Sequence, residues 1–129
     1  MTNEADPTGS IDPIDSLLPL REPTFFILLS LAQGEKHGYA IIKDVGALSR
    51  DGVVLSTGTL YEALARLLDQ TLIERVEEPA ATEEPNHPGR PRKAYRLTAR
   101  GRRVLGAEIE RMQTVLTVAQ WRLSPGWGL

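Results

Sequence analysis

Residues 56–70 have the sequence STGTLYEALARLLDQ, and this stretch decides the fold that we expect. Its leucines fall at spacings typical of one face of an α-helix. Ser56 or Thr57 can cap this helix by accepting a hydrogen bond from a backbone N–H two or three residues ahead. The apolar stripe consists of Leu60, Leu64, Leu67 and Leu68, and the opposite face of Thr59, Glu62, Ala65, Arg66 and Asp69, with Tyr61 at its edge. The stretch predicts a short amphipathic helix with a small, polar outer face.

Two further helices are predicted upstream. Residues 24–34, TFFILLSLAQG, are densely apolar, follow Pro23 and end at Gly34. Residues 37–48, HGYAIIKDVGAL, repeat apolar side chains at every third position. The predicted apolar stripe consists of Phe25, Leu28, Leu29 and Ala32 in the first helix and of Tyr39, Ile41, Ile42, Val45 and Leu48 in the second.

Downstream, the pattern changes to two strands and a long helix. LIERVEE at 72–78 and KAYRLT at 93–98 predict strands, and the intervening segment is rich in proline. That segment is longer than the ~2–5 residues of an ordinary hairpin loop, as functional loops often are. Thr98 can cap the last helix, which ends before the Ser-Pro-Gly at 124–126.

The order of these elements is that of a winged helix-turn-helix. We expect a mainly α fold with a small two-stranded antiparallel β-wing and a long C-terminal helix that forms a homodimer. The three helices would bury Phe25, Leu28, Ile41, Ile42, Leu60 and Leu64 together. The predicted divisions are a flexible acidic tail (1–19), the winged helix-turn-helix domain (20–100), the dimerisation helix (101–123) and a frayed end (124–129).

Composition narrows the classes of function. The chain has 129 residues, a formal net charge of −2 and no cysteine, which excludes disulfides, thiolate metal sites and a cysteine nucleophile. No apolar run approaches the ~20 residues that span a bilayer. The first ten residues lack the basic and apolar regions of a secretion signal. We therefore expect a cytoplasmic protein.

Charge is distributed unevenly along the chain. Residues 1–35 hold six acids and one cation, whereas residues 89–103, GRPRKAYRLTARGRR, hold seven cations and no acid. A cationic stretch without counter-charges attracts a polyanion such as the DNA backbone. Arg90, Arg92 and Lys93 would lie at the wing tip, where arginine suits the negative potential of a narrow minor groove.

The helix at 56–70 supplies further candidate DNA contacts. Its first turn presents backbone N–H groups that favour phosphate. Tyr61 has two interpretations, as a hydroxyl donor to phosphate or as a side chain partly buried beside Leu64. The candidate DNA-binding residues are Tyr39, Lys43, Ser56, Thr57, Thr59, Tyr61, Arg66, Arg90, Arg92 and Lys93.

Three stretches of the sequence resemble the PadR family of bacterial transcriptional regulators. They are HGYAI at 37–41, STGTLYEALARLLDQTLI at 56–73 and GRPRKAYRLTARGRRVL at 89–105. The resemblance implies DNA binding as a homodimer, often as a repressor that a small molecule releases. The family usually has Pro where Thr57 stands and Gly where Thr71 stands. Thr57 can still cap a helix, whereas Thr71 replaces a residue suited to a positive-φ helix end.

The last helix resembles the short form of the family, in which one C-terminal helix makes the dimer. Its apolar residues recur at alternating spacings of four and three, which is a heptad seam. The expected interface residues are Leu105, Ile109, Met112, Leu116, Ala119 and Leu123. The alternative is that Leu105, Ile109 and Met112 pack on their own domain.

Trp121 lies on the same helix near Val118 and Met112, where two such helices would meet. Short-form relatives can hold flat aromatic effectors between their subunits, and aromatic side chains stack on such molecules. The resemblance thus implies an effector site at Met112, Val118 and Trp121; alternatively, Trp121 simply fills the interface. The two histidines lack metal-ligand spacing, so we expect no metal and no cofactor.

The leading hypothesis is therefore a homodimeric, sequence-specific DNA-binding transcriptional regulator, with double-stranded DNA as its partner. A second hypothesis is a winged-helix protein–protein interaction module whose basic wing binds an acidic partner, such as the acidic residues 1–22 of the chain itself. An enzyme is the weakest option, because no nucleophile–base pair, phosphate loop or metal spacing is present.

Overall fold

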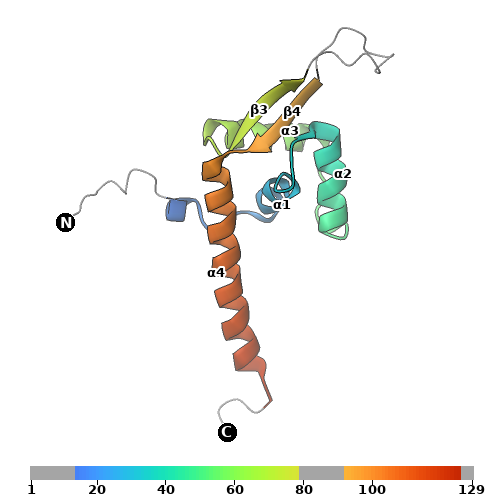
Figure 1. Cartoon of the computed structure of the whole chain (residues 1–129). Helices are drawn as coiled ribbons and strands as arrows, with labels where there is room; N and C mark the ends of the chain where they lie inside the picture. The colour runs from blue at the N-terminus through green and yellow to red at the C-terminus, as the bar shows by residue number, and fades with distance from the viewer. Residues whose placement is uncertain (1–13, 79–91, 126–129) are drawn as a thin grey trace, which may run out of the picture. The chain divides into compact units, whose positions relative to one another are not determined.

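A computed structural model describes residues 14–78 and 92–125 of the chain (Figure 1). Residues 20–102 form one compact unit, and a second unit contains η2 and α4 from residue 103 onward. The elements are η2 (Ile14–Leu17), α1 (Glu22–Ser30), β2 (Lys36–His37), α2 (Gly38–Leu48), α3 (Thr57–Asp69), β3 (Ile73–Glu78), β4 (Arg92–Leu97) and α4 (Ala99–Leu123). The predicted order of helices and strands is confirmed.

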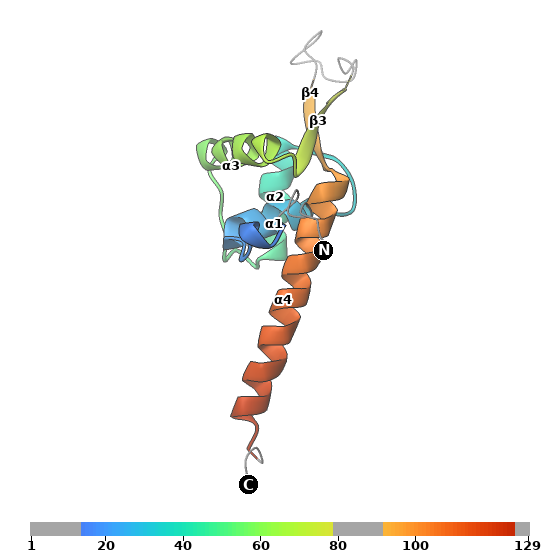
Figure 2. The ribbon, with the colours of Figure 1, turned by 90° about the vertical axis from the view of Figure 1, so that its left-hand side faces the viewer.

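Three antiparallel strands, rather than the two predicted, form the sheet. β4 lies in the middle, with β3 on one side and the two-residue β2 on the other. β3 and β4 form a hairpin, and α3 packs beside β3 (Figures 1 and 2). We missed β2 because two residues carry no alternating pattern. Its pairing of His37 with Ala94 ties the start of α2 directly to the wing.

The core of residues 20–102 is apolar and comes from α1, α2, α3, β3, β4 and the segments that connect them. Its buried hydrophobic side chains are Ile27, Leu28, Leu31, Ile41, Val45, Val53, Leu55, Leu60, Ala63, Leu64, Leu67, Leu72, Ile73, Ala94, Tyr95 and Leu97. Four of the six predicted core residues are fully buried, whereas Phe25 and Ile42 are only half-buried. Two members of the apolar stripe predicted for α2, Tyr39 and Leu48, are exposed.

The first helix differs from its prediction in both face and length. The segment is apolar on all sides, so sequence spacing did not identify the buried face, which carries Ile27 and Leu28 rather than Phe25 and Leu29. α1 ends at Ser30, and the chain continues in turns stabilised by i→i+3 hydrogen bonds as far as Gly34.

Both ends of α3 are closed by identifiable hydrogen bonds. Ser56 is the N-cap, since its Oγ accepts a hydrogen bond from Thr59 N at 3.1 Å. At the other end, Leu72 N donates to Leu67 O and Thr71 N donates to Leu68 O. This pair of bonds is a Schellman motif with Thr71 at the left-handed position, and the φ of Thr71 is 58°.

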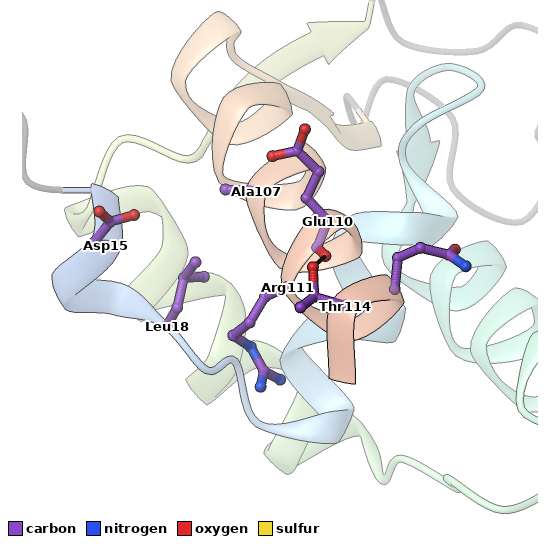
Figure 3. A pocket seen from close by; sticks show the side chains of 7 residues that line it. Asp15, Leu18, Ala107, Glu110, Arg111 and Thr114 are labelled. Atoms are coloured by element: carbon purple, nitrogen blue, oxygen red, sulfur yellow. Dashed lines mark hydrogen bonds between the residues drawn. The ribbon is translucent and has the colours of Figure 1, made fainter. Parts of the chain in front are cut away.

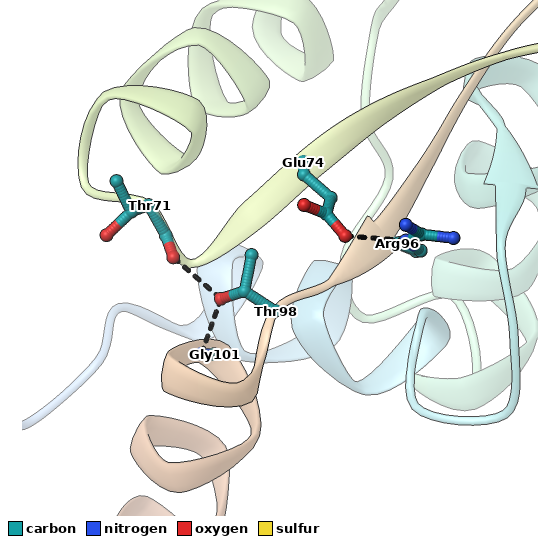
Figure 4. A network of polar contacts seen from close by, with 5 residues as sticks. All are labelled: Thr71, Glu74, Arg96, Thr98 and Gly101. Atoms are coloured by element: carbon teal, nitrogen blue, oxygen red, sulfur yellow. Dashed lines mark hydrogen bonds and ion pairs between the residues drawn. The ribbon is translucent and has the colours of Figure 1, made fainter.

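The turn after α3 also fixes the start of α4. The Thr98 hydroxyl donates to Thr71 O at 2.6 Å and accepts from Gly101 N at 3.0 Å, which caps α4 (Figure 4). A Cβ on Gly101 would lie 2.0 Å from Leu72 O, so only glycine fits at this contact. The helix therefore begins at Ala99, directly after the capping residue Thr98 that the sequence predicted.

The second unit consists of η2 and the part of α4 after residue 102. Val104, Leu105 and Glu108 are buried, whereas every residue from Gln113 to Leu123 is exposed. Glu108 receives two hydrogen bonds from the Arg111 guanidinium, at 2.7 and 3.1 Å. Among the described residues, no helix is both long enough and apolar enough to cross a membrane.

Candidate nucleic-acid interface

The outer face of α3 is polar and accessible, as the sequence predicted. Ser56, Thr57, Thr59 and Arg66 are all exposed, while Leu60, Leu64 and Leu67 are buried on the opposite side. The Ser56 hydroxyl donates to Thr59 Oγ1 at 3.0 Å. Because Thr59 Oγ1 is an acceptor in that bond, its own hydrogen remains available for an outside acceptor. The first turn of α3 thus presents a preorganised donor on a narrow surface.

Tyr61 has one edge in solvent and one edge in the fold. Its side chain is 46% exposed, so each of the two interpretations describes part of it. Burial raises the pKa of the neighbouring Tyr95, and the proximity of Tyr61 raises it further, while Arg75 lowers it. Tyr61 therefore approaches β4 while its ring remains accessible at the surface.

Tyr39 and Lys43 form a second accessible pair on α2. Tyr39 is 73% exposed, and the Lys43 ammonium lies 5.8 Å from the centroid of its ring, within the range of a cation–π contact. The spacing of four residues places both side chains on one face of α2. A positive charge held over an exposed aromatic ring suits contact with a phosphate backbone.

Part of the basic stretch serves the fold, which corrects our expectation that it has no counter-charges. The Arg96 guanidinium donates to the Glu74 carboxylate at 2.6 Å (Figure 4), and this pair raises the pKa of Arg96. Arg100 donates to Gln70 O, the C-cap carbonyl of α3, and Arg102 donates to Ala32 O beyond the end of α1 at 2.8 Å. Cations at helix C-termini satisfy free carbonyls and the negative end of the helix dipole.

The register of the hairpin places acids opposite the cations of the wing. Lys93 pairs with Glu77 and Arg92 pairs with Glu78 across the two strands. Lys93 is exposed, and Arg90 lies outside the described residues. The register therefore aligns two acidic positions of β3 with two basic positions of β4.

A small cavity lies behind the outer face of α3. It has a volume of about 180 Å³ and contains groups of both charges. Its lining residues are Arg21, Pro23, Thr24, Leu55, Thr59, Glu62, Ala63 and Arg66. Two residues proposed to contact DNA, Thr59 and Arg66, therefore also line the space between α1 and α3.

The residues predicted for the dimer interface differ in how much surface they offer. Leu105 is only 5% exposed in the single chain, so little of its side chain remains for a partner. Ile109 and Leu116 are about half exposed, and Leu123 is 84% exposed. The accessible part of the heptad seam therefore begins one turn after Leu105.

The three predicted effector residues do not share one face of α4. Nine residues separate Met112 from Trp121, and at 3.6 residues per turn their directions differ by about 180°. Trp121, which is 65% exposed, lies on the same side of α4 as Val118, whereas Met112 lies on the heptad seam. A pocket containing all three would need Met112 from one helix and Trp121 from another.

A wide groove in the second unit lies elsewhere on α4. It has a volume of about 630 Å³, and Asp15 and Leu18 face α4 across it (Figure 3). The residues contributed by α4 are Ala107, Glu110, Arg111, Gln113 and Thr114, and none belongs to the predicted effector set. Within the described residues, no group of three His, Cys, Asp or Glu side chains is placed to hold a metal ion.

The fold and the exposed α3 face define the class of this protein, a winged helix-turn-helix regulator of transcription. The chain belongs to the PadR family: residues 27–107 match the Transcriptional regulator PadR-like family. A comparison with curated proteins finds no match.

Several solved structures are similar to this chain. A PadR family transcription regulator from Clostridium difficile R20291 is 26% identical, with a TM-score of 0.63 over 81% of this chain and 100% of its own. A PadR-like transcription factor from Bacteroides fragilis is also 26% identical, with a TM-score of 0.59 over 92% and 100% of the two chains. Bacillus subtilis PadR in complex with operator DNA is 24% identical, with a TM-score of 0.58 over 69% of this chain and 48% of that chain.

Proposed function

We propose that this transcriptional regulator is a repressor that binds a specific operator as a homodimer. One observation carries the proposal: α3 buries its leucines on one side and exposes only small or polar groups at its N-terminal end on the other. A helix of this kind enters a major groove and reaches base edges with its first residues. The likeness to Bacillus subtilis PadR, whose structure contains operator DNA, supports the same role for the fold.

Each candidate residue has a distinct role in the proposal. Thr59 and Arg66 approach the major groove from α3, with Ser56 and Thr57 at the start of that helix. Tyr39, Lys43 and Tyr61 contact the flanking phosphates. Arg90, Arg92 and Lys93 would contact the adjacent minor groove, whose negative potential suits arginine.

The dimer forms through the end of α4. Ile109, Leu116 and Leu123 form an exposed apolar seam at heptad spacing, and Met112 and Ala119 lie on the same seam. A contiguous apolar surface of this kind on a single chain marks an interaction site. Two α4 helices that pack along the seam would hold two α3 helices at a fixed separation.

Release by a small aromatic effector completes the proposal. Repression follows when the operator overlaps a promoter, and the effector would act by favouring a dimer whose α3 helices no longer match the operator. Trp121 and Val118 from one subunit and Met112 from the other are the residues that we assign to this site. Such a regulator works where the chromosome is, so a cytoplasmic location is part of the proposal.

The test is a fluorescence anisotropy titration against the DNA upstream of the gene that encodes this chain. The logarithm of affinity should fall with the logarithm of salt at about −0.9 per phosphate neutralised. Arg66→Ala should weaken binding and flatten this slope. Arg122→Ala, near the far end of α4, removes the same charge and is the matched control. It should leave both the DNA affinity and its salt dependence unchanged.

Run-off transcription from the same promoter tests repression and release. The protein should reduce transcript, and adding flat aromatic compounds should restore it. Binding that is indifferent to salt, or equal for operator and unrelated DNA, would contradict the proposed function.

A further inference from the structure

Gly38 is the first residue of α2 and is buried against the tip of Tyr61. A Cβ at this position would lie 2.5 Å from Tyr61 Oη and 3.1 Å from Tyr61 Cζ. The next nearest atom, Leu60 Cδ2, would be at an ordinary contact distance of 3.5 Å. The Tyr61 hydroxyl therefore occupies the space that a side chain at residue 38 would fill.

The backbone gives no other reason for glycine at this position. Among the described residues, Gly34 is the glycine with a positive φ, so residue 38 adopts a conformation open to any L-amino acid. Alanine is also the better helix former. The absence of a Cβ at Gly38 thus serves the neighbouring tyrosine and not the local chain.

Three elements of the DNA-binding unit meet at this tyrosine. Tyr61 lies on α3, Gly38 starts α2, and Tyr95 on β4 is close enough for Tyr61 to raise its pKa. His37, directly before Gly38, pairs with Ala94 in the wing. The Tyr61 side chain therefore lies where α2, α3 and β4 come together.

We infer that Gly38 is a positioning residue for DNA binding, because it holds the Tyr61 hydroxyl where it reaches a phosphate of the operator backbone. The inference rests on the proposed function. A methyl group at residue 38 would push the hydroxyl outward by about 1 Å, since non-bonded atoms settle ~3.5 Å apart. O–H···O hydrogen bonds span only ~2.5–3.0 Å, so the bond to a fixed phosphate would be lost.

The displacement should leave the fold intact, so the effect of Gly38→Ala on DNA affinity can be separated from an effect on stability. The atom that must move is the far end of a flexible side chain, and its residue is 46% exposed. Gly38→Ala should therefore keep its thermal midpoint while its DNA affinity falls about tenfold, the effect of one hydrogen bond to a charged oxygen.

A double-mutant cycle on the full chain tests the inference. Gly38→Ala and Tyr61→Phe should each lower operator affinity about tenfold, and the double variant should lose no more than either, because both remove the same hydrogen bond. The salt slope should stay unchanged in all three, since the tyrosine is uncharged. Gly46→Ala on the same helix, whose Cβ would make an ordinary 3.5 Å contact with Asp51, is the matched control and should bind normally.

Spectra recorded without DNA separate this inference from the proposed function. The chain has three tyrosines, so ¹³Cζ-tyrosine NMR resolves them. Gly38→Ala should move the Tyr61 resonance and leave that of Tyr39 in place. If the wild type binds no DNA but this shift occurs, the proposed function fails while the placement of Tyr61 stands.

Three outcomes would overturn the inference. The inference fails if Gly38→Ala binds the operator as the wild type does, or if its loss of affinity multiplies with that of Tyr61→Phe to about a hundredfold. If Gly38→Ala does not fold, Gly38→Ala with Tyr61→Leu removes both close atoms and should fold. If this double variant also fails to fold, the backbone at residue 38 requires glycine regardless of Tyr61.

Discussion

Replacing Thr71 with glycine should stabilise the protein. Thr71 occupies the left-handed position of the Schellman motif that ends α3, with a φ of 58°. A β-branched side chain is strained in this conformation, and glycine is not. The hydrogen bonds that define the motif come from backbone groups, so the substitution preserves them.

The magnitude follows from two opposing effects. Removing Cβ from a left-handed residue relieves about 1–2 kcal/mol. Glycine also has more conformational freedom than threonine in the unfolded chain, which lowers the free energy of unfolding by about 0.4–1 kcal/mol. The Thr71 hydroxyl donates to Gln70 O, but this bond is exposed and competes with water. The midpoints of these two ranges leave a net gain of about 0.8 kcal/mol, equivalent to roughly 3–6 °C in Tm for a domain of this size.

Urea and thermal unfolding followed by circular dichroism measure this effect. Protein concentration must be held constant, because self-association adds to apparent stability. Ala65→Gly, on the exposed face of the same helix, is the control and should lower stability by about 1 kcal/mol. A Thr71→Gly variant that is no more stable than the wild type would refute the assignment of strain to this turn.

The remaining predictions concern contacts within the same unit. Gly101→Ala should destabilise the fold by about 2–3 kcal/mol in urea unfolding, because its Cβ would strike the rigid carbonyl of Leu72; an unchanged midpoint would contradict this packing. Lys36→Met should lower stability by about 1–2 kcal/mol, since it removes the 2.7 Å hydrogen bond from the ammonium to Ser30 O; a neutral result would show that this bond contributes nothing. Folding raises the pKa of Tyr95 above 10.0, so the contribution of Tyr95 to stability is complete below that pH and is lost as pH rises through the folded pKa. Tyr95→Phe should therefore make the loss of stability at alkaline pH less steep, and an unchanged steepness would exclude this tyrosine as its cause.

The sequence predicts α3 well because the determinants of this helix are local. Its cap, its leucine stripe and its polar face all occur within residues 56–70, and each is confirmed. The first helix lacks such information, because an apolar segment has no polar face to set its orientation. Its buried side could be identified only from the elements packed around it.

The fate of the basic stretch depends on contacts between distant parts of the chain. Arg96, Arg100 and Arg102 find Glu74, Gln70 and Ala32 as partners, all at least 22 residues away. The register of β3 with β4, across a long connection, decides which cations face acids, and no local pattern specifies it. The opposed directions of Met112 and Trp121, in contrast, follow from their spacing alone, and the sequence was sufficient to detect them.

Hydroxyl-radical footprinting of the upstream DNA tests the central claim most directly. Two α3 helices held by paired α4 helices should protect two patches on one face of the duplex, about 10 base pairs apart from centre to centre. The comparison is made at protein concentrations at which the anisotropy titration shows that all the DNA is bound. Protection of only one patch, or no protection at all, would then contradict a dimer that reads DNA through α3.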